Sequence, residues 1–462
     1  MDAVPTTLDV AQSLLRAGQL AAAGNACLAR LARAPEDAQA MLLLGQVLLA
    51  MGETARAVSS LTKAVTRDPS LAAVAALGTA LAGCDGEASD WMVLGNALVE
   101  HHRHEEALAS FRRALAVEPG HAGARNNAGA MLMLLRRHEE ALALLEGSGA
   151  DLNARWNAGL VRLGLGDYRA GWIDHEARWA CGQVPRRAID TPAWLGDGDL
   201  AGRRLLLVAE QGLGDTLQFC RYALLAAARG AEVIMDVQPP LVRLLARMPG
   251  VSAVVAQLQQ PLPAFDLHCP MMSLPLAFGT ELDSIPNAVP YLVADPEGRA
   301  RWRRRLAALP GRRIGLVWAG APRPFQPSAA RTDQRRSMPL SALAPLASVR
   351  DVSWISLQKG EAAAQMPPDG LRLIDWTDEL DDFADTADLV AALDLVISVD
   401  TSMVHLAGGL GVPVWIMSRN DACWRWLTGR VDSPWYPTAL LFQQPSPGDW
   451  TSVVEAVVQA LT

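Results

Sequence analysis

The stretch Asp400-Thr-Ser-Met-Val-His405-Leu-Ala-Gly-Gly-Leu-Gly411-Val-Pro413 decides how the second half of this chain folds. An apolar, β-branched run precedes it at Leu395–Val399 and predicts a buried parallel strand. Asp, Thr and Ser are good N-cap residues, so a helix of small residues is expected to begin here and to end at Gly411 and Pro413. A second apolar run, residues 412–417, predicts the next strand.

This strand–turn–helix–strand unit places the N-terminus of its helix at the carboxyl edge of a sheet. Backbone N–H groups and the helix dipole at such an edge bind phosphate. The residues that present these groups are Thr401, Ser402 and Met403, and His405 lies one helical turn inside. The stretch therefore predicts a site for a phosphorylated ligand.

The composition bounds the class of protein. A length of 462 residues is too great for one core and predicts two or three domains. Half of the residues are hydrophobic and 19% are charged, which is typical of a soluble globular protein rather than a disordered one. A net charge of −8 and the lack of a polybasic run disfavour nucleic acid and anionic membranes as partners.

The sequence also lacks the patterns of secretion and of cysteine frameworks. Residues 1–7 have neither a basic nor an apolar signal region, and the longest near-apolar run, residues 71–83, is too short to span a bilayer. The six cysteines are scattered without a C-x-x-C pair, which argues against a zinc site and against a disulfide framework. A reduced cytoplasm is the expected location.

The first third of the chain has a helical repeat. Residues 8 to about 180 are rich in Ala and Leu at helical spacing and contain no convincing strand. Pro35 and Pro69 are 69 − 35 = 34 residues apart, and Gly95 and Gly129 are also 129 − 95 = 34 apart. This period of helix–turn–helix units is the tetratricopeptide signature. Gly45 precedes Gly95 by 50 residues, so an insertion or a degenerate helix is expected around residues 72–88.

A stack of such units has a concave groove that binds extended peptides or helices. Asn127 and Asn157 each lie two residues before a repeat glycine, at Gly129 and Gly159, and are candidates to hydrogen-bond a peptide backbone. The alternative is ordinary surface asparagine. The array is expected to close at residues 166–179.

From Arg204 onward, short apolar strands alternate with helices, which predicts a parallel sheet. The turn after the first strand carries Gly212, Gly214 and Asp215. Glycines at such a turn let the backbone approach a ligand, so Gly212 and Gly214 are candidates to contact a substrate. The turn is not a Walker loop, and it lacks the third glycine of a dinucleotide fingerprint. From this turn alone, Asp215 is explained more simply as a helix N-cap than as a catalyst.

A second lobe begins near Arg313, where residues 314–320 predict a strand that runs into a glycine turn. The polar segment after Gly320 is either a solvated basic loop or a flap whose Arg336 or Arg331 neutralises a diphosphate. Lys359 follows the next predicted strand, at the edge where it can reach a phosphate. The acidic run 378–385 precedes a predicted helix, so capping explains it better than metal binding.

Several features of this second part carry a family resemblance. They are the 400–413 stretch, the Gly-Asp pair at 214–215, Trp318, Gly320, Asp333, Arg336 and Ser337. Together they resemble the donor-site signature of bacterial heptosyltransferase-like glycosyltransferases, which have two Rossmann-like lobes, the GT-B fold. The chain departs from the family at Ser402, where Gly is usual, and in the extra residues 325–330.

The resemblance implies an α + α/β fold in four parts: a tetratricopeptide-repeat solenoid (1–180), a connection (181–202), a GT-B N-terminal lobe on the acceptor side (203–300) and a C-terminal lobe on the nucleotide-sugar side (301–462). It implies that Asp215 is the general base for the acceptor hydroxyl. It implies a donor site built from Gly320, Arg336, Lys359, Asp400 and the helix start, with His405 nearby. It also implies inversion without a metal or other cofactor, and a last helix, from Asp449, that crosses back to the first lobe.

The order of the domains is similar to that of bacterial flagellin glycosyltransferases and to the division of labour in O-GlcNAc transferase. This implies O-linked transfer from a nucleotide sugar to Ser or Thr of a protein acceptor, with flagellin the leading candidate. Two alternatives stay open. One is a lipid-linked or polysaccharide acceptor, and the other is a non-catalytic scaffold with a degenerate transferase fold, which Ser402 and the altered 323–337 segment favour.

Overall fold

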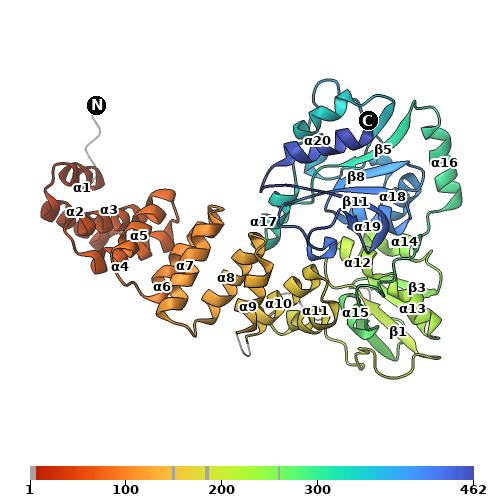
Figure 1. Ribbon diagram of the computed structural model, residues 1–462, viewed down its shortest axis with the longest axis horizontal. Helices are drawn as coiled ribbons and strands as arrows, with labels where there is room; N and C mark the ends of the chain where they lie inside the picture. The colour runs from red at the N-terminus through yellow and green to blue at the C-terminus, as the bar shows by residue number, and fades with distance from the viewer. Residues whose placement is uncertain (1–6, 148–150, 183–186, 259–260) are drawn as a thin grey trace. The chain divides into compact units, whose positions relative to one another are not determined.

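The computed structural model describes residues 7–147, 151–182, 187–258 and 261–462 (Figure 1). The chain divides into two compact units between Ala158 and Gly159. In the described part of residues 7–182 every regular element is helical, as predicted. None of the described helices has the length and apolar character needed to cross a membrane.

The first unit is a series of antiparallel helix pairs, α1–α2, α3–α4, α6–α7 and α8–α9. Its helices are α1 (Thr7–Arg16), α2 (Leu20–Arg33), α3 (Ala38–Ala50), α4 (Thr54–Arg67), α5 (Leu71–Ala82), α6 (Ala88–Glu100), α7 (His104–Val117), α8 (Ala122–Leu134) and α9 (His138–Glu146), and α10 (Leu152–Leu165) crosses into the second unit. The single helix α5 lies between two pairs. It is the insertion expected around residues 72–88, and it accounts for the 50-residue spacing.

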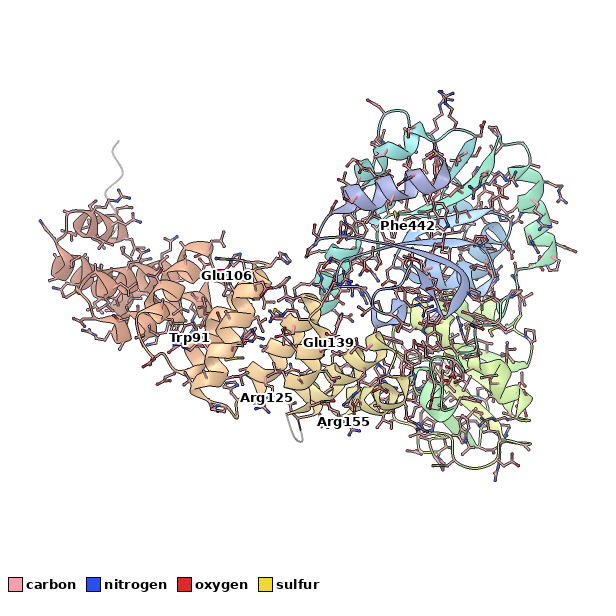
Figure 2. The ribbon with its side chains drawn as sticks, viewed as in Figure 1. Trp91, Glu106, Arg125, Glu139, Arg155 and Phe442 are labelled. Carbon is pink, nitrogen blue, oxygen red and sulfur yellow. The ribbon has the colours of Figure 1, made fainter. Side chains whose placement is uncertain are left out.

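The repeat glycines are required by the packing within each pair. A Cβ on Gly45 would lie 2.4 Å from Leu61 Cγ, and a Cβ on Gly95 would lie 2.4 Å from Phe111 Cε1. In both pairs the blocking residue follows the glycine by 16 positions (61 − 45 and 111 − 95). The first helix of a pair therefore lacks a side chain where the second helix inserts a large one. Trp91, labelled in Figure 2, lies one helical turn before Gly95 on α6 and is also buried.

The second unit contains two sheets. Its helices are α11 (Tyr168–His175), α12 (Leu213–Phe219), α13 (Tyr222–Ala228), α14 (Val242–Leu245), α15 (Leu274–Ala277), α16 (Pro296–Leu306), α17 (Pro327–Arg336), α18 (Phe383–Val390), α19 (Ser402–Gly409) and α20 (Trp450–Leu461), with short 3-10 helices η1 (Glu176–Trp179), η3 (Met271–Ser273) and η4 (Leu340–Ser348) among others. Its strands are β1 (Arg204–Val208), β2 (Glu232–Val237), β3 (Val251–Ala256), β4 (Leu267–Pro270), β5 (Arg312–Val317), β6 (Val352–Ser356), β7 (Leu373–Asp375), β8 (Leu395–Val399), β9 (Val414–Ser418), β10 (Asp432–Ser433) and β11 (Tyr436–Gln443).

The first sheet has the order β3-β2-β1-β4, and all of its pairs are parallel. The second sheet has the order β10-β11-β9-β8-β5-β6-β7 and is parallel except for the β10–β11 pair. Connections between parallel strands run through helices, which is the Rossmann-like arrangement. The predicted fold class, a helical repeat region followed by two Rossmann-like lobes, is confirmed.

The two sheets share one apolar core, and the candidate site lies where they meet. One continuous apolar core runs from the first sheet, through α12 and α19, to the second sheet, and it includes Leu207, Leu217, Leu406 and Val396.

The last helix, α20, packs on η4 and β11 of the second lobe, so the implied crossing back to the first lobe is wrong. Trp415 and Phe442, whose rings lie 5.1 Å apart on β9 and β11, belong to this second-lobe packing (Figure 2).

Candidate active site between the two sheets

The N-terminal halves of α12 and α19 pack against each other at the carboxyl edges of the two sheets (Figure 1). The contact is made at Gly214, where a Cβ would lie 2.8 Å from His405 Cδ2 and 3.4 Å from Ser402 Cα. The Gly-Asp pair and the 400–413 stretch, almost two hundred residues apart, are thus brought together. Gly214 serves the packing of the two helices, and its contact with an acceptor stays a prediction.

Asp215 is both a helix cap and a link between the lobes. Its Oδ2 accepts the Gly212 N–H at 2.8 Å, and its Oδ1 accepts from the guanidinium of Arg425. The carboxylate is still 20% exposed, and its oxygens have lone pairs beyond those two bonds. Asp215 therefore caps α12 and at the same time lies where the two lobes meet.

Arg425 is buried in the closing segment of the second lobe and reaches across to the first. Its Nε donates to Gln218 Oε1 at 2.7 Å, in addition to the bond with Asp215. Burial alone lowers the pKa of Arg425, but the nearby Cys423 sulfur and the Asp215 carboxylate outweigh it and hold the pKa above its ordinary value. Sequence reasoning missed this partner of Asp215 because the two residues are 210 positions apart.

The start of α19 is formed as predicted. The Thr401 hydroxyl accepts the Met403 N–H at 3.3 Å and is hydrogen-bonded to Ser398 Oγ at 3.1 Å. Thr401 and Ser402 are half-buried and Met403 is buried. The first N–H groups of a helix have no partner inside it, so this end can receive an anion.

Asp400 precedes this helix and is only 8% exposed. Its backbone carbonyl accepts from Arg336 Nη1 at 3.1 Å. Its carboxylate has no hydrogen-bond or ion-pair partner among the side chains that the structure describes. The positive charges of Arg419 and Arg425 lie close enough to interact with this carboxylate, and its oxygens have lone pairs that can accept from a ligand with hydroxyl donors.

His405 lies deeper, in an aromatic setting. Its Nδ1 is hydrogen-bonded to the Tyr436 hydroxyl at 2.8 Å, and its ring stacks on Trp426 at 5.6 Å. Burial, together with the positive charges of Arg425 and Arg221, holds the pKa of His405 well below its usual range. The His405 ring is therefore held in its neutral form behind the helix start, and its contact with a donor stays a prediction.

The segment after Gly320 is held by its own side chains. Arg336 Nε and Nη2 donate to Asp333 Oδ1 at 3.0 and 2.7 Å, and Ser337 Oγ accepts the Gly320 N–H at 3.0 Å. A Cβ on Gly320 would lie 2.1 Å from Asp333 Oδ1, so a larger residue would have to displace the Asp333–Arg336 pair. Residues 327–336 form α17 rather than the expected loop or flap, and Arg336 positions the turn before α19.

Arg323, which sequence reasoning did not single out for binding, is a further cation of this segment. It is exposed and has no ion-pair partner among the described residues. Desolvation of its guanidinium and the nearby Arg336 lower the pKa of Arg323, while Asp333 and Asp215 act in the opposite direction. Its position near both Asp215 and Arg336 places it at the meeting of the lobes.

Lys359 and its neighbour have different tasks. Lys359 is exposed at the end of β6, and its Nζ donates to the Leu380 carbonyl. Gln358, which is buried, accepts from the N–H groups of Trp318 and Ala319 at 3.0 and 2.9 Å. Gln358 thus fixes the turn after β5. A polar residue at the end of a buried strand was the available signal for it.

Other candidate positions give structural explanations. Asp382 caps α18 through the Ala384 N–H at 2.8 Å, as expected for the acidic run. No group of three metal-ligating side chains occurs in the described part of the chain. A cavity of about 580 Å³ lies at the other end of α19, lined by residues 410–413 and by arginines of α16, and is separate from the helix starts that form the candidate site.

The two asparagines of the repeats bond to other asparagines. Asn127 Nδ2 donates to Asn96 Oδ1 at 3.0 Å, and Asn157 Nδ2 donates to Asn126 Oδ1 at 2.8 Å. Both bonds join residues 31 positions apart, so the amides of successive repeats form a ladder. An amide oxygen and further N–H groups remain for a ligand, and their contact with a peptide stays a prediction.

Comparisons with known proteins agree with this division. The tetratricopeptide repeat family matches residues 8–82 and 92–151. The chain is 26% identical to Protein FlbA of Caulobacter vibrioides over 465 aligned positions, which cover 94% of this chain and 74% of that protein.

Solved structures match each part separately. A glycosyl transferase family 9 protein from Veillonella parvula is 12% identical, with a TM-score of 0.42, and covers 57% of this chain and 97% of its own. The ADP-heptose lipopolysaccharide heptosyltransferase II of E. coli is 15% identical, with a TM-score of 0.40, and covers 56% and 98%. The repeat protein YrrB is 18% identical, with a TM-score of 0.22, and covers 37% and 82%. The chain thus carries tetratricopeptide repeats in its first part, followed by an α/β region with two parallel sheets.

Proposed function

We propose that this protein is a glycosyltransferase that moves a sugar from a nucleotide-sugar donor to a protein held by the repeats. The observation that carries the proposal is the contact between the starts of α12 and α19, which brings Asp215 of one lobe near Asp400 of the other. The Asp400 carboxylate accepts no hydrogen bond from the described residues, and the charges of Arg419 and Arg425 lie near it. A helix start for phosphate, a carboxylate for sugar hydroxyls and a second carboxylate for a proton are the groups that sugar transfer needs.

The donor would lie with its diphosphate on the N–H groups of Thr401 and Ser402, and on that of Met403 in exchange for its 3.3 Å bond to the Thr401 hydroxyl. Arg323 would neutralise the phosphates, and Asp400 would accept from sugar hydroxyls. The helix dipole and a guanidinium favour the negative charge that develops on a leaving nucleoside diphosphate. With these groups in place, the proposed reaction needs no metal ion.

Asp215 would act as general base from the opposite lobe. The acceptor oxygen forms a bond to the anomeric carbon, while the bond from that carbon to the diphosphate oxygen breaks. The electron pair leaves with the diphosphate, and the proton of the acceptor hydroxyl passes to Asp215. Attack from the face opposite the leaving group would invert the anomeric centre.

The proposed acceptor is a Ser or Thr hydroxyl of a protein, with flagellin the first to be tested. Tetratricopeptide arrays form concave surfaces for polypeptides. The Asn96–Asn127 and Asn126–Asn157 pairs would present amide groups to the acceptor backbone.

A thermal-shift screen of nucleotides and nucleotide sugars tests the donor part, because a ligand that binds only the folded state raises the melting temperature. One nucleoside diphosphate sugar should stabilise the wild type, and Asp400→Asn should weaken that effect for the sugar but not for the free nucleoside diphosphate. Asp394 lies at the opposite end of β8 from Asp400. Asp394→Asn should therefore show the same thermal shifts as the wild type. The absence of any nucleotide-dependent shift would contradict the proposal.

A non-catalytic scaffold is the second candidate, and the Arg425–Asp215 bond favours it, since that bond alone gives Asp215 a structural role. On this alternative, a variant that keeps the fold but loses the base would leave cellular function unchanged.

A further inference from the structure

A buried charge network lies at the carboxyl edge of the first sheet, next to the loop between β1 and α12. Arg178, fully buried in η1, donates through Nη2 to Glu210 Oε1 at 2.9 Å and to Ser273 Oγ at 2.8 Å. Its Nη1 donates to Glu176 Oε1, and Ser273 Oγ also donates to that oxygen, at 2.8 Å. The Glu210 side chain is only 3% exposed.

The network joins three segments that are distant in the sequence. Arg178 and Glu176 follow the last helical segment, α11; Glu210 begins the β1–α12 loop; and Ser273 ends η3, after β4. Arg178 is the only one of these side chains that contacts all the others. Its removal would therefore release the loop from Glu176 and Ser273 and leave the Met272 backbone N–H as the contact between Glu210 and η3.

The composition of the network is unfavourable for stability alone. Arg178 Nε and Glu210 Oε2 are buried and have no hydrogen-bond partner among the residues that the structure describes. Buried ion pairs repay their desolvation only when their remaining polar atoms are satisfied, and apolar residues often replace them without loss. A network with these unsatisfied atoms points to a role other than simple packing.

Glu210 is two residues before Gly212, whose N–H is bound by Asp215. The position of the Glu210 side chain thus sets the backbone from which α12 starts. We propose that Arg178 is a positioning residue that fixes the β1–α12 loop through Glu210 and thereby orients Asp215. The segment that follows the repeats would then control the reactive carboxylate, an inference that rests on the proposed function of Asp215.

The network also has a signature in pH. Burial raises the pKa of Glu210 to about 7; Arg178 offsets part of this rise, and Glu176 adds to it. The other titratable groups nearby are Cys269, whose thiol pKa is raised well above its usual value by burial, and His175, whose pKa is held well below its usual value by burial and by Arg178. Glu210 is therefore the group that changes charge near neutral pH, and ionised Glu210 holds Arg178 more firmly.

Four variants of the full chain test this inference: Arg178→Met, Arg178→Lys, Glu210→Gln and the control Arg162→Met. Arg162 forms an ion pair with Asp174 that is also largely buried, and the bonds described for it go to Asp174 and Asp167 of α11 and its cap. Hydrogen exchange of peptides covering residues 209–219 is measured from pH 6 to pH 8. This readout does not depend on activity.

Arg178→Met should speed exchange of the 209–219 peptides by about tenfold, the effect of losing one hydrogen bond between charged groups. Arg178→Lys should keep part of the wild-type protection of these peptides. In Glu210→Gln the protection should no longer depend on pH near 7. Arg162→Met should show the protection of the wild type. Once a donor is known, Arg178→Met should lower kcat more than it raises the donor KM.

Unchanged exchange at 209–219 in folded Arg178→Lys and Glu210→Gln would overturn the inference, as would an equal effect of Arg162→Met. If the exchange results are as expected but the wild type transfers no sugar, the proposed function fails while the positioning of the loop stands.

Discussion

At the scale of single residues, the site is decided by which carboxylates are engaged and which are open. Asp215 is bonded to Gly212 and Arg425, whereas the Asp400 carboxylate accepts no hydrogen bond from the described residues. Sequence reasoning found both residues because each follows a predicted strand. It could not find Arg425 or Arg323, because their positions depend on how the two lobes meet.

Asp215→Asn should reduce sugar transfer by about 10²- to 10⁴-fold, the usual contribution of a general base. The amide can still accept the Gly212 N–H, so the start of α12 should persist, and the donor-dependent thermal shift should be close to that of the wild type. Transfer of labelled sugar and thermal shift are measured together. Asp167→Asn, which alters the cap of α11 outside the site, is the control, and equal losses in both variants would contradict a catalytic role.

Glu210 gives a prediction for stability. Its pKa in the folded state, about 7, lies above its ordinary value, so its contribution to stability is fully present below about pH 4.5 and is lost as the pH rises through 7. The wild type should therefore lose up to roughly 3 kcal/mol of unfolding free energy from this group between pH 4.5 and pH 8.

Urea unfolding of the wild type and of Glu210→Gln across that pH range isolates the effect. The difference between the two proteins should grow with pH in favour of the variant. If the two stability curves run parallel, Glu210 ionises in the folded protein as readily as it does in water.

At the scale of elements, patterns that recur within one segment predict the structure, and contacts between segments do not. The 34-residue period and the β8–α19–β9 unit are confirmed, because each depends on local capping and periodicity. α17 was expected to be a loop or flap because its residues are mostly polar; Asp333 and Arg336 instead pair on one face of a helix. The strands β3, at the edge of the first sheet, and β11, one strand in from the edge of the second, were missed because both are only partly buried.

Gly95→Ala tests the packing inside a helix pair. The added Cβ would lie 2.4 Å from the buried Phe111 ring, so the variant should lose about 1–3 kcal/mol of stability through overpacking. Gly120→Ala, where nothing lies within 4 Å of the new Cβ, should change stability little. Hydrogen exchange of α6 and α7 in the full chain measures both, and equal protection in the two variants would contradict the packing argument.

At the scale of the whole molecule, the end of the helical part of the chain does not coincide with the boundary between the two compact units. The compact second unit begins at Gly159, inside α10. Tyr168 and Trp172 of α11 belong to the same apolar core as β1, and the Tyr168 hydroxyl accepts from Trp435 Nε1 at 2.9 Å. The segment that was expected to close the array thus packs on the second unit through its aromatic residues, which a helical period alone cannot assign to either unit.

Removal of residues 1–150 separates the two proposed tasks, since it keeps α10 whole together with the α11 contacts. The shortened protein should show the same nucleotide-sugar thermal shift as the full chain, because Asp400, Arg323 and the start of α19 remain. It should no longer transfer labelled sugar to a protein acceptor such as flagellin. Combined replacement of Asn96, Asn126, Asn127 and Asn157 by Ala in the full chain should act in the same direction but more weakly, because the groove itself persists. Normal labelling of the acceptor by the shortened protein would mean that the acceptor is recognised at the α/β unit, and the repeats would then serve another partner.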